Sequence, residues 1–188
     1  RYPREFAHFQ PDNDVAIAKQ HRPMLVNAYD NSVRYTDYVL SKIIDYLGSL
    51  ENTSSALLYC ADHGEDLIDD HRERFLHASP TTTAYQLYVA SLAWFSESYR
   101  ERFPEKVAAA EANATAPATT HALFHTMADM ASIRGRFLMT KVSLVSPDFD
   151  RTAPRRYLND HNEAVPYRKT GLRPEDMEVF RRYGIELN

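Results

Sequence analysis

The sequence contains a single cysteine, Cys60, among 188 residues. A disulfide within the chain is therefore excluded, which agrees equally with a reducing cytosol and with a periplasmic domain that folds without bridges. The formal net charge is only −4, so the chain lacks the basic field expected of a partner of nucleic acid. No apolar run approaches the roughly 18 residues needed to cross a bilayer, and no signal peptide is visible.

The chain does contain alternating helix and strand patterns. Val33, Ile43 and Leu47 fall on one apolar stripe of a helix predicted over residues 27–47, which Gly48 would end. Short apolar runs predict buried strands, the first of them best interpreted as a parallel strand, and further periodic segments predict helices. The strands are predicted over 55–61, 87–95 and 138–146, and the other helices over 103–114 and 121–133 and near 174–184. This order indicates an α/β fold, in which sites collect at the carboxyl ends of strands.

One such strand end carries the stretch "LLYCADHGED", where the apolar run passes directly into Asp62, His63, Gly64 and Glu65. Just past a strand, the backbone can turn neighbouring carboxylate and imidazole groups toward one ion, and glycine permits unusual backbone angles and close approach. An oxygen and a nitrogen ligand suit zinc, or less selectively manganese or iron. The nearby "FLHASP" supplies His77, which could bind a second metal or donate to a phosphate oxygen. Glu65 could act as a ligand or as an acceptor behind the ligands.

Structural interpretations compete with these functional ones. A DHG tripeptide also occurs by chance in ordinary turns. His71 lies in a run of charges and is expected on the solvated surface. His121 and His125 have a metal-pair spacing, but no glutamate follows His121, so the zinc-protease signature is missing. Cys60, inside a predicted strand, is expected to be buried and inert.

Six stretches, in order, resemble the C-terminal half of the catalytic domain of bacterial phosphoethanolamine transferases, which belong to the sulfatase and alkaline-phosphatase superfamily. These stretches are "RYPREFAHFQP", "VNAYDNSVRYTDYVLSKIIDYL", "LLYCADHGED", "FLHASP", "LAWFS" and "HALFHTMADMASI", which cover roughly residues 1–135. The resemblance implies a three-layer α/β/α alkaline-phosphatase-like (sulfatase) fold, here as a partial domain. Residues 1–188 are expected to form the C-terminal portion of a periplasmic catalytic domain, with the other half and a transmembrane region upstream.

The resemblance also implies a reaction and roles for individual residues. Family members are bacterial inner-membrane proteins in which a threonine nucleophile takes phosphoethanolamine from phosphatidylethanolamine and passes it to lipid A or another envelope glycan such as the lipopolysaccharide core. Asp62 and His63 match the family's zinc ligands. His77 and Glu65 match residues at the catalytic centre, His77 contacting the phosphoryl group or a second zinc ion. Membrane contact is expected through the upstream region, and nucleic acid is not expected as a partner.

The sequence also departs from the family pattern. The nucleophilic threonine and a zinc-binding glutamate are expected upstream of Arg1, so the chain alone is predicted to lack transferase activity. Ala78 replaces a usual glycine, and "DLIDDHRER" replaces a glycine-containing loop, which leaves the acceptor open. Two alternatives remain at this point. One is another superfamily enzyme, a sulfatase or a phosphoglycerol transferase, and the other is a non-catalytic remnant of the fold that binds a partner.

Overall fold

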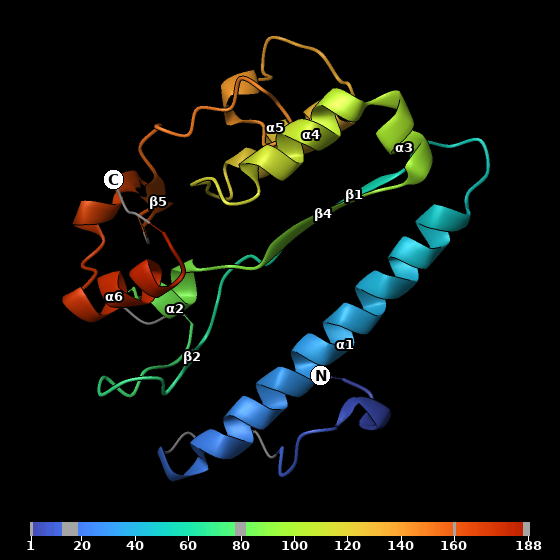
Figure 1. Cartoon of the computed structure of the whole chain (residues 1–188). Helices are drawn as coiled ribbons and strands as arrows, with labels where there is room; N and C mark the ends of the chain where they lie inside the picture. Colours follow the sequence, from blue (N-terminus) through green and yellow to red (C-terminus); the bar gives the residue numbers. More distant parts are fainter. Residues whose placement is uncertain (1, 13–18, 78–81, 160, 186–188) are drawn as a thin grey trace.

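The computed structural model describes residues 2–12, 19–77, 82–159 and 161–185. A 28-residue helix, α1 (Arg22–Ser49), leads into strand β1 (Ala56–Cys60) (Figure 1). The remaining elements, in chain order, are β2 (Asp66–Leu67), β3 (Phe75–Leu76), α2 (Ala84–Leu87), β4 (Ser91–Phe95), α3 (Glu97–Arg102), α4 (Pro104–Asn113), α5 (Ala122–Met130), β5 (Arg156–Leu158), β6 (Ala164–Pro166) and α6 (Pro174–Arg182). Short 3-10 turns lie at Arg4–Phe6, Lys19–His21, Thr140–Val142 and Tyr167–Lys169. None of the helices in these ranges is long and apolar enough to cross a membrane.

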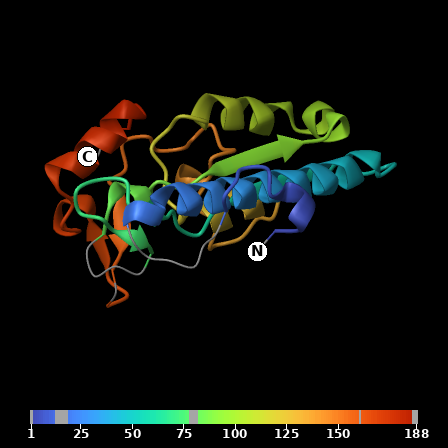
Figure 2. The same ribbon diagram turned by 90° about the horizontal axis from the view of Figure 1, so that it is seen from below.

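Strands β1 and β4 form a two-stranded ribbon with helices on both sides. Figure 1 shows α1 on one side of the ribbon and α4 and α5 on the other, and Figure 2 shows α1 running alongside it. A Cβ atom added to Gly48 near the end of α1 would lie 3.8 Å from the ring of Trp94 in β4, so the helix packs directly on the ribbon. This layering is the partial α/β/α arrangement that the sequence predicts.

Helix α1 forms as predicted, because its apolar stripe is periodic and Pro23 starts it without losing a hydrogen bond. The stripe is only partly covered, however, and Val33 is 51% exposed. The fully buried residue of α1 is polar: Asn31 accepts a hydrogen bond from the backbone N–H of Phe9 (2.9 Å) and donates one to the carbonyl of Phe9 (3.0 Å). This amide fixes the N-terminal segment against the helix.

The pairing of the ribbon differs from the prediction. β1 and β4 are antiparallel, with Ala56 opposite Phe95 and Cys60 opposite Ser91. The chain between them turns back through a short hairpin and α2 rather than crossing over through a long helix, so parallel pairing is ruled out for these two strands. The prediction of full burial is also wrong: β1 is partly buried along its length, and Cys60 is a partly buried free thiol whose pKa is raised by burial.

The third predicted strand, residues 138–146, is absent from the described structure, where a 3-10 turn at Thr140–Val142 and further turns take its place. Side chains of α5 bind this segment through one backbone N–H and one side-chain hydroxyl. Thr126 accepts a hydrogen bond from the backbone N–H of Leu144 (3.0 Å), and Asp129 accepts one from the hydroxyl of Ser143 (2.7 Å). Val145 of this segment belongs to the hydrophobic core, where it packs with Phe95, Tyr99, Val107 and Met130.

A second, smaller core joins α2 to the C-terminal helix α6, which forms where the sequence predicts it. Val179 and Phe180 of α6 pack against Ala84 of α2. The two helices lie together at one end of the molecule (Figures 1 and 2). Tyr85 of α2 packs against this core, and its carbonyl oxygen lies close to Gly64, so the core adjoins the predicted site.

Candidate metal centre

The turn after β1 passes so close to α2 that only glycine fits at its centre. The N–H of Gly64 donates to the carbonyl of Gln86 (2.8 Å), and a Cβ atom added to Gly64 would lie 1.9 Å from the carbonyl oxygen of Tyr85. The expected close approach is therefore confirmed, although the left-handed glycines of the described chain are Gly171 and Gly184 rather than Gly64. The contact with α2 fixes the backbone from which the neighbouring side chains project.

Three of the predicted site residues gather at this turn: His63, Glu65 and His77. Their ligand atoms all lie within 4.8 Å of one another, the one such group among the described residues. Nδ1 of His77 is 2.9 Å from Oε1 of Glu65, and the rings of His63 and His77 have centroids 3.8 Å apart. The short β2–β3 hairpin, which pairs Asp66 with Leu76, brings His77 back to the end of β1.

In His63 and His77, the group that faces Nδ1 determines which ring nitrogen is left for a ligand. Nδ1 of His63 lies 3.0 Å from the carbonyl oxygen of Gly64. Because a carbonyl oxygen can only accept, Nδ1 of His63 is the donor of this hydrogen bond. The carboxylate of Glu65 likewise fixes the proton on Nδ1 of His77. In both rings Nδ1 makes the contact, so Nε2 is the atom left for a metal or a phosphoryl oxygen.

Asp62 lies outside the three-residue group but touches it. Its side chain is 89% exposed, and Oδ2 lies 3.6 Å from Nε2 of His63. Two ligands of a tetrahedral zinc ion with bonds of about 2.0 Å are roughly 3.3 Å apart, so this pair of atoms is spaced for one ion. The 2.9 Å between Glu65 and His77 is a hydrogen-bond distance instead.

The charge balance also fits a cation. Oε2 of Glu65 is buried and has no hydrogen-bond partner among the described residues. A buried carboxylate oxygen without a partner is costly unless a positive charge lies nearby. With the exposed carboxylate of Asp62 and two imidazoles beside it, the donor set has the oxygen and nitrogen chemistry of a zinc site.

Behind the centre lies a buried polar group that sequence reasoning did not single out. Asp66 is buried and accepts hydrogen bonds from the hydroxyl of Thr83 (2.9 Å) and from the amide of Gln86. Burial raises the pKa of Asp66, and these two hydrogen bonds oppose the rise. Thr83 also caps α2 by accepting from the N–H of Gln86. The one available signal was the final Asp of "DHGED", next to Glu65.

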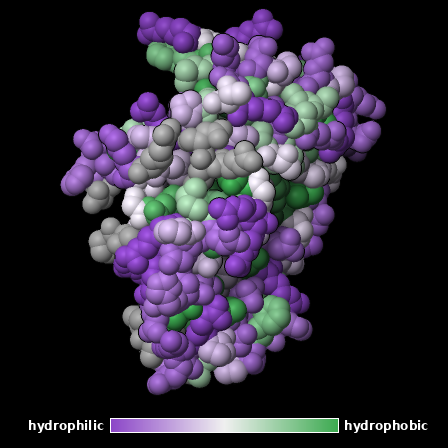
Figure 3. Space-filling model, turned by 60° about the vertical axis from the view of Figure 1, so that its left-hand side comes forward, coloured by the Kyte–Doolittle hydropathy of each residue, from purple (hydrophilic) through white to green (hydrophobic). Residues whose placement is uncertain are grey.

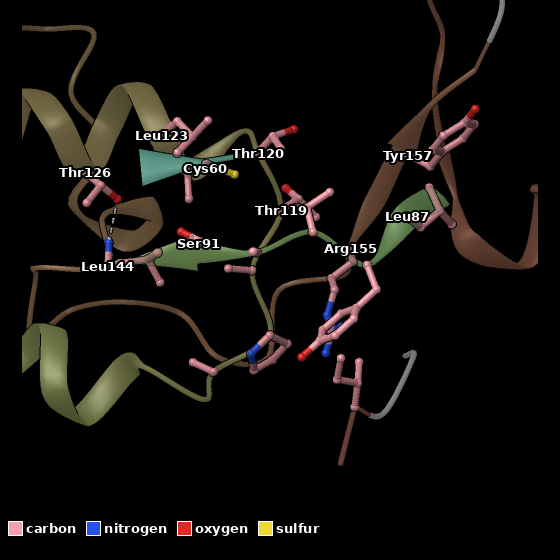
Figure 4. Close-up of a pocket in the computed structure, with 18 of the residues that line it drawn as sticks. Cys60, Leu87, Ser91, Thr119, Thr120, Leu123, Thr126, Leu144, Arg155 and Tyr157 are labelled. Carbon is pink, nitrogen blue, oxygen red and sulfur yellow. Dashed lines mark hydrogen bonds between the residues drawn. The ribbon is translucent and has the colours of Figure 1, made fainter. Parts of the chain in front are cut away.

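Asp62, His63 and His77 line one part of an open cavity of about 2000 Å³. Figure 4 shows its central region, where Cys60 and Ser91 of the ribbon face Thr119, Thr120 and Leu123, and where Arg155 and Tyr157 approach from the C-terminal segment. In Figure 3, apolar side chains gather at mid-height of one face between hydrophilic regions. The centre thus lies at the edge of an open cavity with apolar and basic walls.

The other histidines behave as the structural interpretations predict. His71 is exposed, 3.9 Å from Glu175. His125 is buried and accepts a hydrogen bond from the N–H of Met139 through Nδ1 (3.2 Å). Its neighbour His121 contributes only a ring contact, with centroids 5.2 Å apart. Among the described residues, no third ligand lies close enough to form a group with this pair.

Comparison with known proteins establishes the class to which this fold and turn belong. The Sulfatase family model matches residues 1–133, and the chain belongs to the Sulfatase family. Among curated proteins it is 31% identical over 152 residues to the phosphoethanolamine transferase EptA of Salmonella typhimurium, covering 78% of this chain and 27% of that protein. It is 35% identical over 103 residues to the Kdo(2)-lipid A phosphoethanolamine 7''-transferase of Escherichia coli, covering 54% of this chain and 17% of that protein.

Solved structures agree with this assignment. The C-terminal periplasmic domain of phosphoethanolamine transferase EptC from Campylobacter jejuni superposes with a TM-score of 0.70 at 27% identity, covering 80% of this chain and 47% of that one. The corresponding domain of Escherichia coli EptC, in complex with zinc, has a TM-score of 0.70 at 23% identity, covering 90% and 47%. The predicted resemblance to phosphoethanolamine transferases and the predicted fold are confirmed, and the chain spans about half of these domains.

Proposed function

We propose that this chain is the C-terminal portion of the catalytic domain of a bacterial phosphoethanolamine transferase. The rest of that domain and a membrane-spanning region would lie upstream in the parent protein, meaning the full-length protein that contains these residues. The observation that carries the proposal is the grouping of His63, Glu65 and His77 at the end of β1. The relatives support it, because each is named as a phosphoethanolamine transferase or as a domain of one.

Asp62 and His63 would hold a zinc ion together with ligands from the upstream half. Three features support this pairing. Their ligand atoms are spaced for one ion, Nδ1 of His63 is committed to a carbonyl, and the zinc complex of the Escherichia coli EptC domain provides a precedent in the same fold. A bound zinc ion would lower the pKa of a coordinated hydroxyl and offset the negative charge that develops on a phosphoryl group.

His77 and Glu65 would act on the phosphoryl group rather than hold the metal. The carboxylate of Glu65 accepts a hydrogen bond from Nδ1 of His77 and would orient its ring. Nε2 of His77 can then bind a phosphoryl oxygen or give its proton to the oxygen that leaves. Glu65 is thus a positioning residue and His77 the group that meets the substrate.

The donor would be phosphatidylethanolamine and the acceptor lipid A or another envelope glycan. A relative named for transfer to Kdo(2)-lipid A supports this acceptor class, and the open cavity beside His77 has apolar and basic walls. The periplasmic domains among the structural relatives support a location at the bacterial inner membrane, with the catalytic domain facing the periplasm.

The test is transfer by the purified parent protein in detergent, with phosphatidylethanolamine and lipid A as substrates and mass spectrometry as the readout. We expect lipid A to gain phosphoethanolamine, and the His77→Ala variant to lose most of this turnover. His71→Ala, an exposed histidine of the same loop, is the matched control. Transfer of glycerol phosphate from phosphatidylglycerol, hydrolysis of an aryl sulfate, or no reaction at all would each contradict the proposal.

A further inference from the structure

We propose that Asp176, on the C-terminal helix α6, is a positioning residue. It fixes the two segments of the candidate metal centre, residues 62–66 and 72–77, relative to each other. The side chain is fully buried, and it lies in a part of the sequence with no metal-binding motif. The inference rests on the proposed function for its catalytic consequence. Its structural content, a connection between α6 and two loops, can be tested without activity.

The carboxylate of Asp176 receives hydrogen bonds from three separate segments. Arg72 donates two, from Nη2 to Oδ1 (2.8 Å) and from Nη1 to Oδ2 (2.9 Å). The backbone N–H of Ala84 donates to Oδ1 (2.9 Å), and that of Arg173 donates to Oδ2 (2.9 Å). One side chain thereby joins the hairpin loop, the start of α2 and the start of α6.

The first connection runs through α2 to His63 and Glu65. Asp176 holds the N–H of Ala84, the first residue of this four-residue helix. The helix in turn holds Gly64 through Gln86, at a separation that leaves no space for a side chain. A shift of α2 would therefore move the backbone between His63 and Glu65.

The second connection runs through Arg72 to His77. The Arg72 side chain is only 3% exposed, and it binds Asp70 as well as Asp176, so the loop between β2 and β3 is fixed from within. The N–H of Ile68 donates to the carbonyl of Arg74 (2.9 Å), and β3 then delivers His77. Loss of the contact between Arg72 and Asp176 would make the β2–β3 hairpin, which His77 directly follows, more mobile.

The connection through Arg72 uses a negative charge on Asp176, because paired anions stabilise a buried guanidinium. Burial alone would raise the pKa of Asp176, but the hydrogen bonds from Arg72, Arg173 and Ala84 lower it below its ordinary value. The carboxylate is thus ionised at neutral pH. An asparagine of the same shape would keep the volume and lose the bidentate ion pair.

The experiment compares Asp176→Asn with Glu178→Gln in the parent protein. Glu178 is a half-exposed carboxylate on the same helix that pairs with Arg181. Hydrogen–deuterium exchange, zinc affinity and turnover are measured at a temperature where circular dichroism shows each variant folded. We expect Asp176→Asn to raise exchange at least fivefold in both segments 62–66 and 72–77, to weaken zinc binding about tenfold and to lower kcat with KM little changed. Glu178→Gln should match the wild type.

Unchanged exchange in either segment of Asp176→Asn would overturn the proposal. If that variant does not fold, Arg72→Lys tests the second connection alone. We expect it to raise exchange in 72–77 and lower kcat about tenfold while zinc affinity stays within twofold, because His77 is not a proposed ligand. Wild-type exchange in 72–77 of Arg72→Lys would overturn the proposal. A parent protein without zinc or transfer would refute the proposed function, whereas the exchange results would still decide the role of Asp176.

Discussion

Nδ1 of His77 lies 2.9 Å from Oε1 of Glu65, although the two residues are twelve positions apart in the sequence. The second oxygen of Glu65 is buried without a hydrogen-bond partner in the described part of the chain. The carboxylate therefore directs one oxygen at an imidazole and keeps the other poorly solvated. This arrangement places the carboxylate of Glu65 beside the His77 ring and orients that ring.

The Glu65→Gln substitution tests this relationship. The amide can still bond His77, but the negative charge beside the ring is removed. We expect turnover of the parent protein to fall roughly 10- to 100-fold, in the range found for groups that orient a catalytic or ligating histidine. Zinc content, measured by elemental analysis of the same preparation, should stay within a factor of two. Loss of zinc in proportion to turnover would show that Glu65 is a ligand instead.

The Gly64→Ala substitution tests the close packing of the turn on α2. The added Cβ atom would meet the Tyr85 carbonyl oxygen at 1.9 Å, so backbone must move. Overpacking of this kind costs about 1–3 kcal/mol. We expect a lower urea midpoint of unfolding and weaker zinc binding. Gly135→Ala is the matched control, because a Cβ atom at Gly135 has nothing within 4 Å. Equal midpoints for the two variants would show that the contact with α2 is not maintained in solution.

The burial of His125, outside the candidate metal centre, predicts that the stability of the protein depends on pH. Burial, and to a smaller extent the neighbouring His121, lowers the pKa of His125 below its ordinary value. The neutral ring is therefore favoured in the folded state. Its contribution to the free energy of unfolding is complete above the unfolded pKa of about 6.5. That contribution is lost as the pH falls through the lower pKa of the folded state. The free energy of unfolding should decrease below about pH 6.5.

The His125→Asn variant separates this effect from other titrations. Asparagine can accept the hydrogen bond from the Met139 N–H without gaining a charge. Urea unfolding from pH 5 to 8 should show a shallower slope for this variant than for the wild type, and His121→Gln, on an exposed residue, should keep most of the wild-type slope. Identical slopes for His125→Asn and the wild type would contradict the burial argument.

Much of the fold could be predicted from local patterns. Helix α1 and helix α6 follow from apolar periodicity and from prolines at their first turns, and β1 follows from a short apolar run. The segment 138–146 has the same kind of apolar run, but the backbone N–H groups of Leu144 and Met139 donate to the side chains of Thr126 and His125 of α5. Such tertiary competition leaves no local signal, so a strand was the natural and incorrect prediction.

The candidate site, like the fold, could be predicted only in part from the sequence. Asp62, His63, Glu65 and His77 stand in motifs that could be recognised from the sequence, and the hairpin that joins them is short. The bond between Arg72 and Asp176 spans 104 positions and depends on two helices packing at one end of the molecule. No periodicity or motif links those two residues, so only the three-dimensional structure shows that α6 contacts the loops of the centre.

The most direct test of the account is the zinc content of the parent protein carrying Asp62→Ala or His63→Ala, with His71→Ala as the control. Zinc is measured per folded protein after dialysis against a weak chelator. We expect the wild type and His71→Ala to retain zinc, and both ligand variants to lose most of it together with transfer activity. Normal zinc content in Asp62→Ala and His63→Ala would contradict the assignment of this strand-end turn as half of a zinc site.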